Sequence, residues 1–363
     1  MKLKIILLVF ACFYMPFRSF SQKKECGTTL TSDNFDVLRS ISTDIIEPLP
    51  SNGKIQYVPI KHHIVRKSDE TGGISTSTIN KIMQELNYIY KEAYVQFYIY
   101  NGIDYINSDM YYDFVDSLEE SSLIATYNSV KSINIYYFHS VILNFSDVAG
   151  YAYLPTGTNT KNFIAIDNES APNGTTVIHE VGHFFGLLHT HETFYGIELI
   201  DGSNGHKAGD ICSDTPADPE LNYNTVNENC EYIGGQEYKG LKYNPNTHNY
   251  MSYSRKECRD EFSNKQLARI YHYSYSAKIQ SYDIKTDPSI IYHTFIQNHT
   301  FDSGNQTFID QNIHAGSNIT NTLLPGPVVI KNSAIVTFEA KESILLQGEF
   351  EVQKGAEFTG KTK

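Results

Sequence analysis

Three histidines near the middle of the chain have a spacing that suits a metal centre. His179 and His183 are four residues apart, so on a helix both side chains lie on one face, one turn from each other. Gly186 can adopt a positive φ, which lets the helix end and brings His189 round toward the same metal. Three neutral histidines with a fourth position left open are typical of catalytic rather than structural zinc. The spacing therefore predicts a catalytic zinc site.

Glu180 directly follows the first of these histidines and can act on a water at the metal. Zinc lowers the pKa of such a water to about 7 and polarises a bound carbonyl. Glu180 would be the general base for attack on a peptide carbonyl, and would then carry the proton to the leaving amine. The short His-Glu-x-x-His match also occurs by chance on solvated helices. The longer pattern that ends at His189 is far rarer by accident.

The pattern from His179 to His189 resembles the signature of the metzincin metallopeptidases. That family also has a methionine turn below the metal, which Asn249-Tyr-Met251-Ser-Tyr253 matches. The resemblance implies that Met251 forms the floor under the histidines, a contact that an ordinary core methionine would also make. It further implies that Tyr253 hydrogen-bonds the oxyanion, a role that zinc would share.

The stretch from Gly209 to Pro216, together with the methionine turn and Cys258, resembles the pappalysin or cytophagalysin branch of that family. The resemblance implies a zinc endopeptidase over roughly residues 55–280. It also implies a calcium site formed by Asp210, Asp214 and the carbonyl of Thr215, since oxygen ligands on a turn suit a hard cation. The alternative is a solvated acidic turn.

Four cysteines follow the first 21 residues, and four cysteines allow three full pairings. Cys26-Gly-Thr resembles a segment that keeps some members of this branch latent, in which the thiolate takes the open position on zinc. Glu25 stands where those relatives have arginine. The alternative for Cys26 is a disulfide with Cys212. The resemblance also implies a disulfide between Cys230 and Cys258.

Lys256 lies five residues after the methionine of the turn. Relatives that cut before Arg or Lys carry an acidic residue shortly after this turn, in the pocket next to the scissile bond. A lysine there would repel basic side chains and attract acidic ones. We therefore expect no preference for Arg or Lys after the cut, with Asp or Glu as the residues that could be favoured instead. The alternatives are that Lys256 points to solvent beside an apolar pocket, or that Glu257 turns inward.

The elements that must position these residues follow a mixed α/β order. We expect helices from 76 or 77 to 90, from 175 to 188 and from 263 to 278, and strands at 55–65, 95–100, 132–138, 151–154 and 163–166. His62 and His63 fall in the first strand and fit a core or surface role better than a metal site. Gly150 to Pro155 resembles the edge strand of the metzincin sheet, to which an extended substrate could add. The alternative is an ordinary short edge strand.

The chain divides into four parts. Residues 1–21 have a charged start, an apolar run and a small-residue cleavage site, which predicts a secretory signal peptide rather than a membrane anchor or a lipoprotein. Residues 22–52 look like a propeptide and 53–283 like the catalytic domain, which includes a long loop-rich stretch at 190–250. Residues 300–363 show short apolar alternations, and resemble the small β-stack modules that end many secreted bacterial proteins. The expected class is an α/β (α+β) catalytic domain with a mixed twisted sheet, followed by a small all-β module.

Composition excludes some classes of function. The net charge of −12 argues against a nucleic-acid partner. The sequence has no second long apolar run, which argues against stable membrane insertion. The sequence thus predicts a secreted zinc metalloendopeptidase that acts on proteins or peptides. The alternative is a secreted binding or adhesion protein with a relic metal site, supported by the β-module and the 27 tyrosines. A relic would be free to lose Glu180, Tyr253 or a histidine, and none is lost.

Overall fold

The structure is a computed structural model that describes residues 23–41, 47–156, 161–286, 293–319 and 325–362. The predicted signal peptide, residues 1–21, lies outside the described residues. Within the described ranges, no helix is long and apolar enough to cross a membrane.

A mixed sheet forms the centre of the catalytic part, in the order β2-β1-β4-β8-β7. Its strands are parallel except for β7, which runs antiparallel to β8 at the edge. Ten of the eleven residues of β1 are buried, as expected for a strand that is covered on both faces. The mixed α/β class is confirmed, and the strands are β1 (Gln56–Arg66), β2 (Val95–Asn107), β4 (Ile133–Phe138), β7 (Gly150–Ala152) and β8 (Phe163–Asp167).

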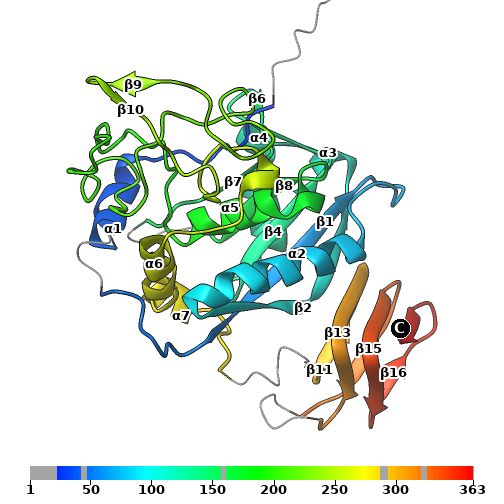
Figure 1. The fold of residues 1–363 in the computed structure, drawn as a ribbon. Coiled ribbons are helices and arrows are strands. Elements are labelled where there is room, and N and C mark those ends of the chain that lie inside the picture. Colours follow the sequence, from blue (N-terminus) through cyan, green and yellow to red (C-terminus); the bar gives the residue numbers. More distant parts are fainter. Residues whose placement is uncertain (1–22, 42–46, 157–160, 287–292, 320–324, 363) are drawn as a thin grey trace, which may run out of the picture.

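Two helices, α2 (Thr76–Tyr90) and α5 (Thr175–Phe184), pack together against one face of this sheet (Figure 1). The apolar stripe of α2 faces the main core, and Ser75, one residue before the predicted caps, accepts a hydrogen bond from the Thr78 N–H. The helix predicted from 175 to 188 ends at Phe184, because Gly186 has φ +86° and turns the chain. The helix predicted from 263 to 278 is two helices, α6 (Asn264–Ser274) and α7 (Ala277–Gln280), since Ser276 caps a second start.

The opposite face of the sheet is covered by short elements that the sequence did not predict, together with a second hydrophobic cluster. They are α3 (Asp109–Tyr112), β3 (Asp113–Val115), α4 (Asp116–Tyr127), β5 (Ser140–Leu143) and β6 (Ser146–Asp147). Two elements lie near the start, η1 (Ser32–Asn34) and α1 (Phe35–Ser40). The long loop at 190–250 is confirmed as loop-rich, with only β9 (Glu237–Tyr238) and β10 (Leu241–Lys242) in it.

The C-terminal strands form two parallel stacks around a hydrophobic cluster of their own. One stack joins the catalytic sheet, because β13 pairs antiparallel with β2 at Gln306–Asp104 and Thr307–Ile103 (Figure 1). Some of the short apolar alternations expected in this region belong to one strand, since residues 336–338 and 344–346 both lie in β15. The strands are β11 (His293–Ile296), β12 (His299–Phe301), β13 (Asn305–Gly316), β14 (Val328–Ile330), β15 (Ile335–Gln347), β16 (Phe350–Val352) and β17 (Glu357–Thr362). The domain boundaries themselves stay predictions.

Candidate active site

Helix α5 presents His179 and His183 from adjacent turns, and both side chains are buried. Gly182 lies between them and faces the sulfur of Met251, which is fully buried below. A Cβ atom on Gly182 would lie 2.6 Å from that sulfur, so a side chain there would push the methionine turn away. The predicted floor under the histidines is therefore a close contact between a glycine and Met251.

Hydrogen bonds fix the orientation of two of the imidazoles. His179 Nδ1 lies 2.7 Å from the Tyr250 carbonyl oxygen, and His183 Nδ1 lies 2.8 Å from the Leu187 carbonyl oxygen. A carbonyl can only accept, so each Nδ1 carries the proton and each neutral ring turns an unprotonated Nε2 inward. Burial lowers the pKa of His183 to about 4, which keeps this ring neutral. Such an arrangement is typical of histidines that bind a metal.

His189 completes the group after the turn at Gly186. Its Nε2 lies 3.1 Å from His183 Nε2, which lies 3.1 Å from His179 Nε2. The next residue, Thr190, donates its N–H to the Met251 carbonyl at 3.2 Å and so ties the histidine to the methionine turn. The Nε2 lone pairs of His179 and His183 face each other and the Nε2 atom of His189 in a buried space, and a cation between them would relieve their repulsion. The residues present therefore fit a zinc ion.

The N-terminal segment lies across this group. Cys26 Sγ is 3.5 Å from His183 Nε2, and the sulfur and the three histidine nitrogens all lie within 4.8 Å of one another. The segment pairs with the sheet edge, since Ala149 N–H donates to the Lys24 carbonyl and Gly27 N–H donates to the Gly150 carbonyl, each at 2.9 Å. The edge that the sequence predicted for substrate is thus occupied here by the chain itself. Burial raises the pKa of the Cys26 thiol.

Glu180 is fully buried beside this segment. Its Oε2 accepts a hydrogen bond from Thr28 Oγ1 at 3.1 Å, whereas its Oε1 has no hydrogen-bond partner. Burial raises the pKa of Glu180 to about 8. A carboxyl with a pKa near neutrality is suited to take up and release a proton. Thr28 is a contact that the sequence analysis missed.

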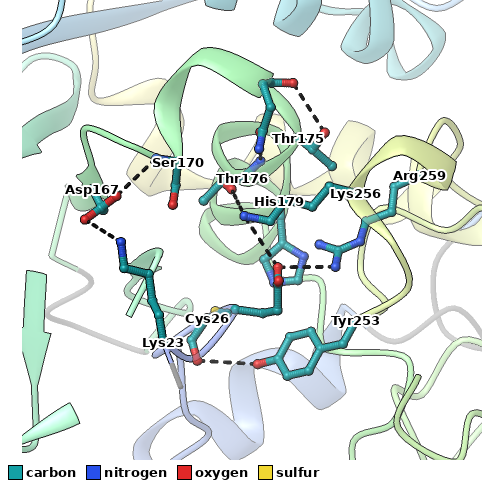
Figure 2. A network of polar contacts seen from close by, with 12 residues as sticks. Lys23, Cys26, Asp167, Ser170, Thr175, Thr176, His179, Tyr253, Lys256 and Arg259 are labelled. Atoms are coloured by element: carbon teal, nitrogen blue, oxygen red, sulfur yellow. Dashed lines mark hydrogen bonds and ion pairs between the residues drawn. The ribbon is translucent and has the colours of Figure 1, made fainter. Parts of the chain in front are cut away.

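Tyr253 packs against His189, with the two ring centroids 4.9 Å apart. Its hydroxyl donates to the carbonyl of Cys26 at 3.4 Å (Figure 2). Burial raises the pKa of Tyr253, so the phenol stays protonated and remains a donor. The ring of His191, which is not a member of the histidine group, packs against both Tyr253 and His189.

Lys256 points inward and reaches Glu25, with Nζ 3.6 Å from Oε2. Arg259, which the sequence analysis missed, reaches the same oxygen with Nη2 at 3.3 Å. Glu257 turns away and pairs with Arg255 at 2.7 Å. Neither alternative for this pocket is therefore seen, because Lys256 does not point to solvent and Glu257 does not turn inward.

Two of the four cysteines after the predicted signal peptide are bonded to each other. Cys230 and Cys258 form a disulfide with a Cα–Cα distance of 5.5 Å, which confirms that pairing. Cys26 and Cys212 are both free and buried, so the alternative disulfide between them is not formed. The disulfide links Cys230 of the long loop to Cys258, which directly precedes Arg259.

Asp210 and Asp214, two of the residues predicted to bind calcium, contact different parts of the protein. Asp210 Oδ1 accepts from Thr215 Oγ1 and from the Cys212 N–H, both at 2.9 Å. Asp214 accepts from Ser263 Oγ at 2.7 Å and from the Lys265 N–H at 2.9 Å, at the start of α6. Among the described residues, only the histidine group with Cys26 brings three or more His, Cys, Asp or Glu ligand atoms within 4.8 Å.

Glu198 is a further acidic residue of this loop that the sequence analysis did not single out. It is 6% exposed, and its Oε2 has no hydrogen-bond partner. Gly205 and Gly209 make room for it, because a Cβ on either would lie 2.5 Å from one of its carboxylate oxygens. Burial, and then the charges of Asp210 and Asp218, raise the pKa of Glu198 to about 8. Only the folded loop brings these three carboxyl groups together.

The chain is similar in sequence to known metallopeptidases. Residues 76–190 match the model of the reprolysin-like metallopeptidase family M12B. An extracellular metalloprotease of Neurospora crassa is 30% identical over 236 residues, which cover 60% of this chain and 74% of that protein. One of Sordaria macrospora is 31% identical over 236 residues, with the same coverage of 60% and 74%. Among solved structures, a promirolysin variant of Tannerella forsythia is 18% identical, with a TM-score of 0.47, and the match covers 71% of this chain and 96% of that one.

Proposed function

Because this chain belongs to the family of extracellular metalloproteases, we propose that it is a secreted zinc endopeptidase that its own N-terminal segment holds latent. The observation that carries the proposal is the convergence of three histidine nitrogens and one cysteine sulfur within 4.8 Å, directly beside a buried glutamate. The naming of the relatives as extracellular and the predicted signal peptide both support secretion.

His179, His183 and His189 would hold the zinc ion, with Cys26 as fourth ligand while the segment is present. When bound, zinc supplies a Lewis acid that polarises the scissile carbonyl and makes water a better nucleophile. The three imidazoles are neutral and face one another, which is the protonation state that metal binding requires. A thiolate at the fourth position would close the site to water.

The chain's own residues perform the proton transfers. Glu180 would take a proton from the attacking water and then pass it to the amine that leaves. Its Oε1 has no hydrogen-bond partner, so one carboxylate oxygen is free to take up a proton. Tyr253 stays protonated and would donate a hydrogen bond to the oxygen on which negative charge develops.

The segment from Glu25 to Thr28 contacts the histidine group, Glu180 and Tyr253. Cys26 lies at the histidines, Thr28 bonds Glu180, and the Tyr253 hydroxyl points at the Cys26 carbonyl. The backbone of the segment also takes the sheet edge, which supports that edge as the place for an extended substrate once the segment has left. Proteolytic removal of the segment would then activate the enzyme.

Three finer assignments belong to the same proposal. The Gly209–Pro216 stretch, the methionine turn and the disulfide in the expected register support the pappalysin or cytophagalysin branch. Structural calcium at Asp210, Asp214 and the Thr215 carbonyl remains a proposal, to which we add Glu198, whose buried Oε2 has no hydrogen-bond partner. The C-terminal strands would serve as an attachment or spacer module.

One experiment separates the enzyme from the alternative, a binding protein with a relic metal site. The purified full chain, before and after limited proteolysis of its N-terminal segment, is tested on casein and on a peptide library, with and without a zinc chelator. We expect cleavage only after activation and only without the chelator. A chain that binds zinc but cuts no peptide in any of these conditions would contradict the proposal.

A further inference from the structure

A carboxylate of the N-terminal segment lies between two cations, one of them buried and the other partly buried. Glu25 Oε2 is 3.3 Å from Arg259 Nη2 and 3.6 Å from Lys256 Nζ (Figure 2). The side chain of Arg259 is 2% exposed and that of Lys256 is 17% exposed. Glu25 directly precedes Cys26, whose sulfur lies at the histidine group. The pocket is therefore one residue away from the reacting centre.

The protein holds both cations in place without help from Glu25. Arg259 Nε donates to the Ser254 carbonyl at 2.7 Å, and a second nitrogen of the same guanidinium donates to that oxygen as well. Lys256 Nζ donates to Thr176 Oγ1 at 3.2 Å, in the first turn of α5. The disulfide anchors the residue between them, Cys258. The two positive groups will thus keep their positions when the segment leaves.

No other acidic group in the described ranges forms an ion pair with these cations, although the charge of Lys256 also opposes the rise in the pKa of Glu180. Among the described residues, Glu25 is the only carboxylate within 4.0 Å of Lys256 or Arg259. The nearest acid in the sequence, Glu257, pairs with Arg255 instead. A buried and a partly buried cation held close together without an anion are unfavourable, so removal of the segment leaves a site that favours a carboxylate.

We propose that Lys256 and Arg259 form the pocket for the side chain next to the scissile bond, and that the activated enzyme cleaves at Asp and Glu. In the latent chain, the Glu25 carboxylate pairs with both cations in the way that the acidic side chain of a substrate would. The guanidinium fork can pair with a carboxylate, whereas a basic side chain would meet two positive charges. The inference rests on the proposed function and names its substrate class.

The reaction itself is ordinary peptide hydrolysis. The carbonyl C–N bond breaks, the water oxygen bonds to the carbonyl carbon, and one water proton moves to the leaving nitrogen. The acidic side chain in the pocket takes no part in bond exchange. Its role is to fix the position of the peptide relative to Glu180.

Cleavage-site profiling of the activated full chain tests the pocket. We expect Asp and Glu to dominate a position that flanks the cut, which the sequence analysis places after it. Lys256→Gln and Arg259→Gln should each lower kcat/KM for acidic peptides by about 10- to 100-fold, the range for loss of a hydrogen bond to a charged group. Arg255→Gln removes a neighbouring cation that does not reach Glu25, and should leave the preference unchanged. Enrichment of basic or apolar residues beside the cut would overturn the inference.

A peptide provides a test that does not depend on how variants fold. The hexapeptide of residues 23–28 should inhibit the activated enzyme, because it carries both Cys26 and Glu25. Replacement of Glu25 by Gln in the peptide should weaken inhibition about 10-fold or more, for loss of the same charged contacts. Replacement of the exposed Lys24 by Gln is the control and should have little effect. Equal inhibition by all three peptides would overturn the assignment of the pocket.

The two proposals fail in different ways. Chelator-sensitive cleavage without any preference for acidic residues overturns this inference and leaves the proposed function in place. Absence of chelator-sensitive cleavage under every activation condition overturns the proposed function, and this inference with it.

Discussion

At the residue scale, Glu180 differs from the other buried acids near the site, because it lies beside the histidines without belonging to the group of ligand atoms. We predict that Glu180→Gln keeps bound zinc, since the three imidazoles are untouched, and that turnover after activation falls about 10²–10⁴-fold. Metal analysis and peptide hydrolysis measure the two effects separately. Glu169→Gln, which changes an acid with 87% exposure, is the control. Near-normal activity of Glu180→Gln would rule out its role as the base.

The two free cysteines provide a matched test of latency. Both are buried, but only Cys26 lies at the histidine group. We predict that Cys26→Ala gives a full chain that cleaves peptides, or its own N-terminal segment, without added protease. Cys212→Ala should stay latent, because that thiol is not among the converging ligand atoms. Hydrolysis by the freshly purified full-length variants is the measurement, and equal latency of both variants would contradict the switch.

Residues that act through local spacing could be predicted from the sequence. His179, His183 and Glu180 share one helix, and a helix fixes their relative positions. Glu25 and Arg259 are separated by 234 residues, and no local pattern links them. Their contact depends on the segment adding to the sheet edge and on the turn after the methionine, both of which are tertiary features. The same reason explains why Thr28 was missed.

At the scale of elements, the long loop after α5 concentrates negative charge. Glu198 has a pKa of about 8 in the fold against 4.5 for the free side chain, because burial and two neighbouring carboxylates oppose its ionisation. The folded state then binds its proton more tightly than the unfolded state does. The contribution to stability is therefore most favourable below pH 4.5 and is lost as the pH rises toward 8. A bound cation would remove this penalty.

We predict that, in calcium-free buffer, Glu198→Gln raises the Tm at pH 8 relative to the wild type but not at pH 4.5. One pKa unit corresponds to about 1.4 kcal/mol, so the gain should reach a few degrees. Calcium should raise the Tm of the wild type more than that of the variant. Glu237→Gln, an exposed acid in the same loop, should follow the wild type. Identical responses of wild type and Glu198→Gln to calcium would show that this carboxylate is not at a calcium site.

Element boundaries were predicted less well than element types. Helix α5 ends at Phe184 rather than 188, because the turn at Gly186 that brings His189 to the metal group requires the helix to stop first. The last predicted helix breaks at Ser276, whose side chain caps a new start. The elements on the second face of the sheet were missed because α4 has little amphipathic pattern, and even buries Glu119 and Glu120.

At the scale of the whole molecule, the C-terminal strands extend the catalytic sheet. The sequence indicated short apolar alternations after the catalytic domain, which was expected to end at residue 283. It could not show which strand they would pair with, because strand pairing across about 200 residues has no local signal. The junction depends on an irregularity in β2, where Gly102 has φ +72° and lies against the ring of Phe308. The buried Lys61 holds this bend through the Asn101 and Gly102 carbonyls and through Asp104. The junction is therefore built into the catalytic sheet.

The last prediction tests this junction. A Cβ at position 102 would lie 3.0 Å from the Phe308 ring, so Gly102→Ala requires this ring of β13 to move by a few tenths of an ångström. Gly240→Ala is the matched control, because Gly240 has a similar φ of +80° and a Cβ added there would meet nothing within 4 Å. Both variants incur the cost of a left-handed alanine, about 1 kcal/mol, and only Gly102→Ala adds crowding of about 1–3 kcal/mol. We expect faster hydrogen exchange in β13 and faster proteolysis near residues 284–298 for Gly102→Ala alone, with peptide hydrolysis preserved, since the substitution is remote from the histidines. Equal effects of the two substitutions would show that β13 does not depend on this contact for its place beside β2.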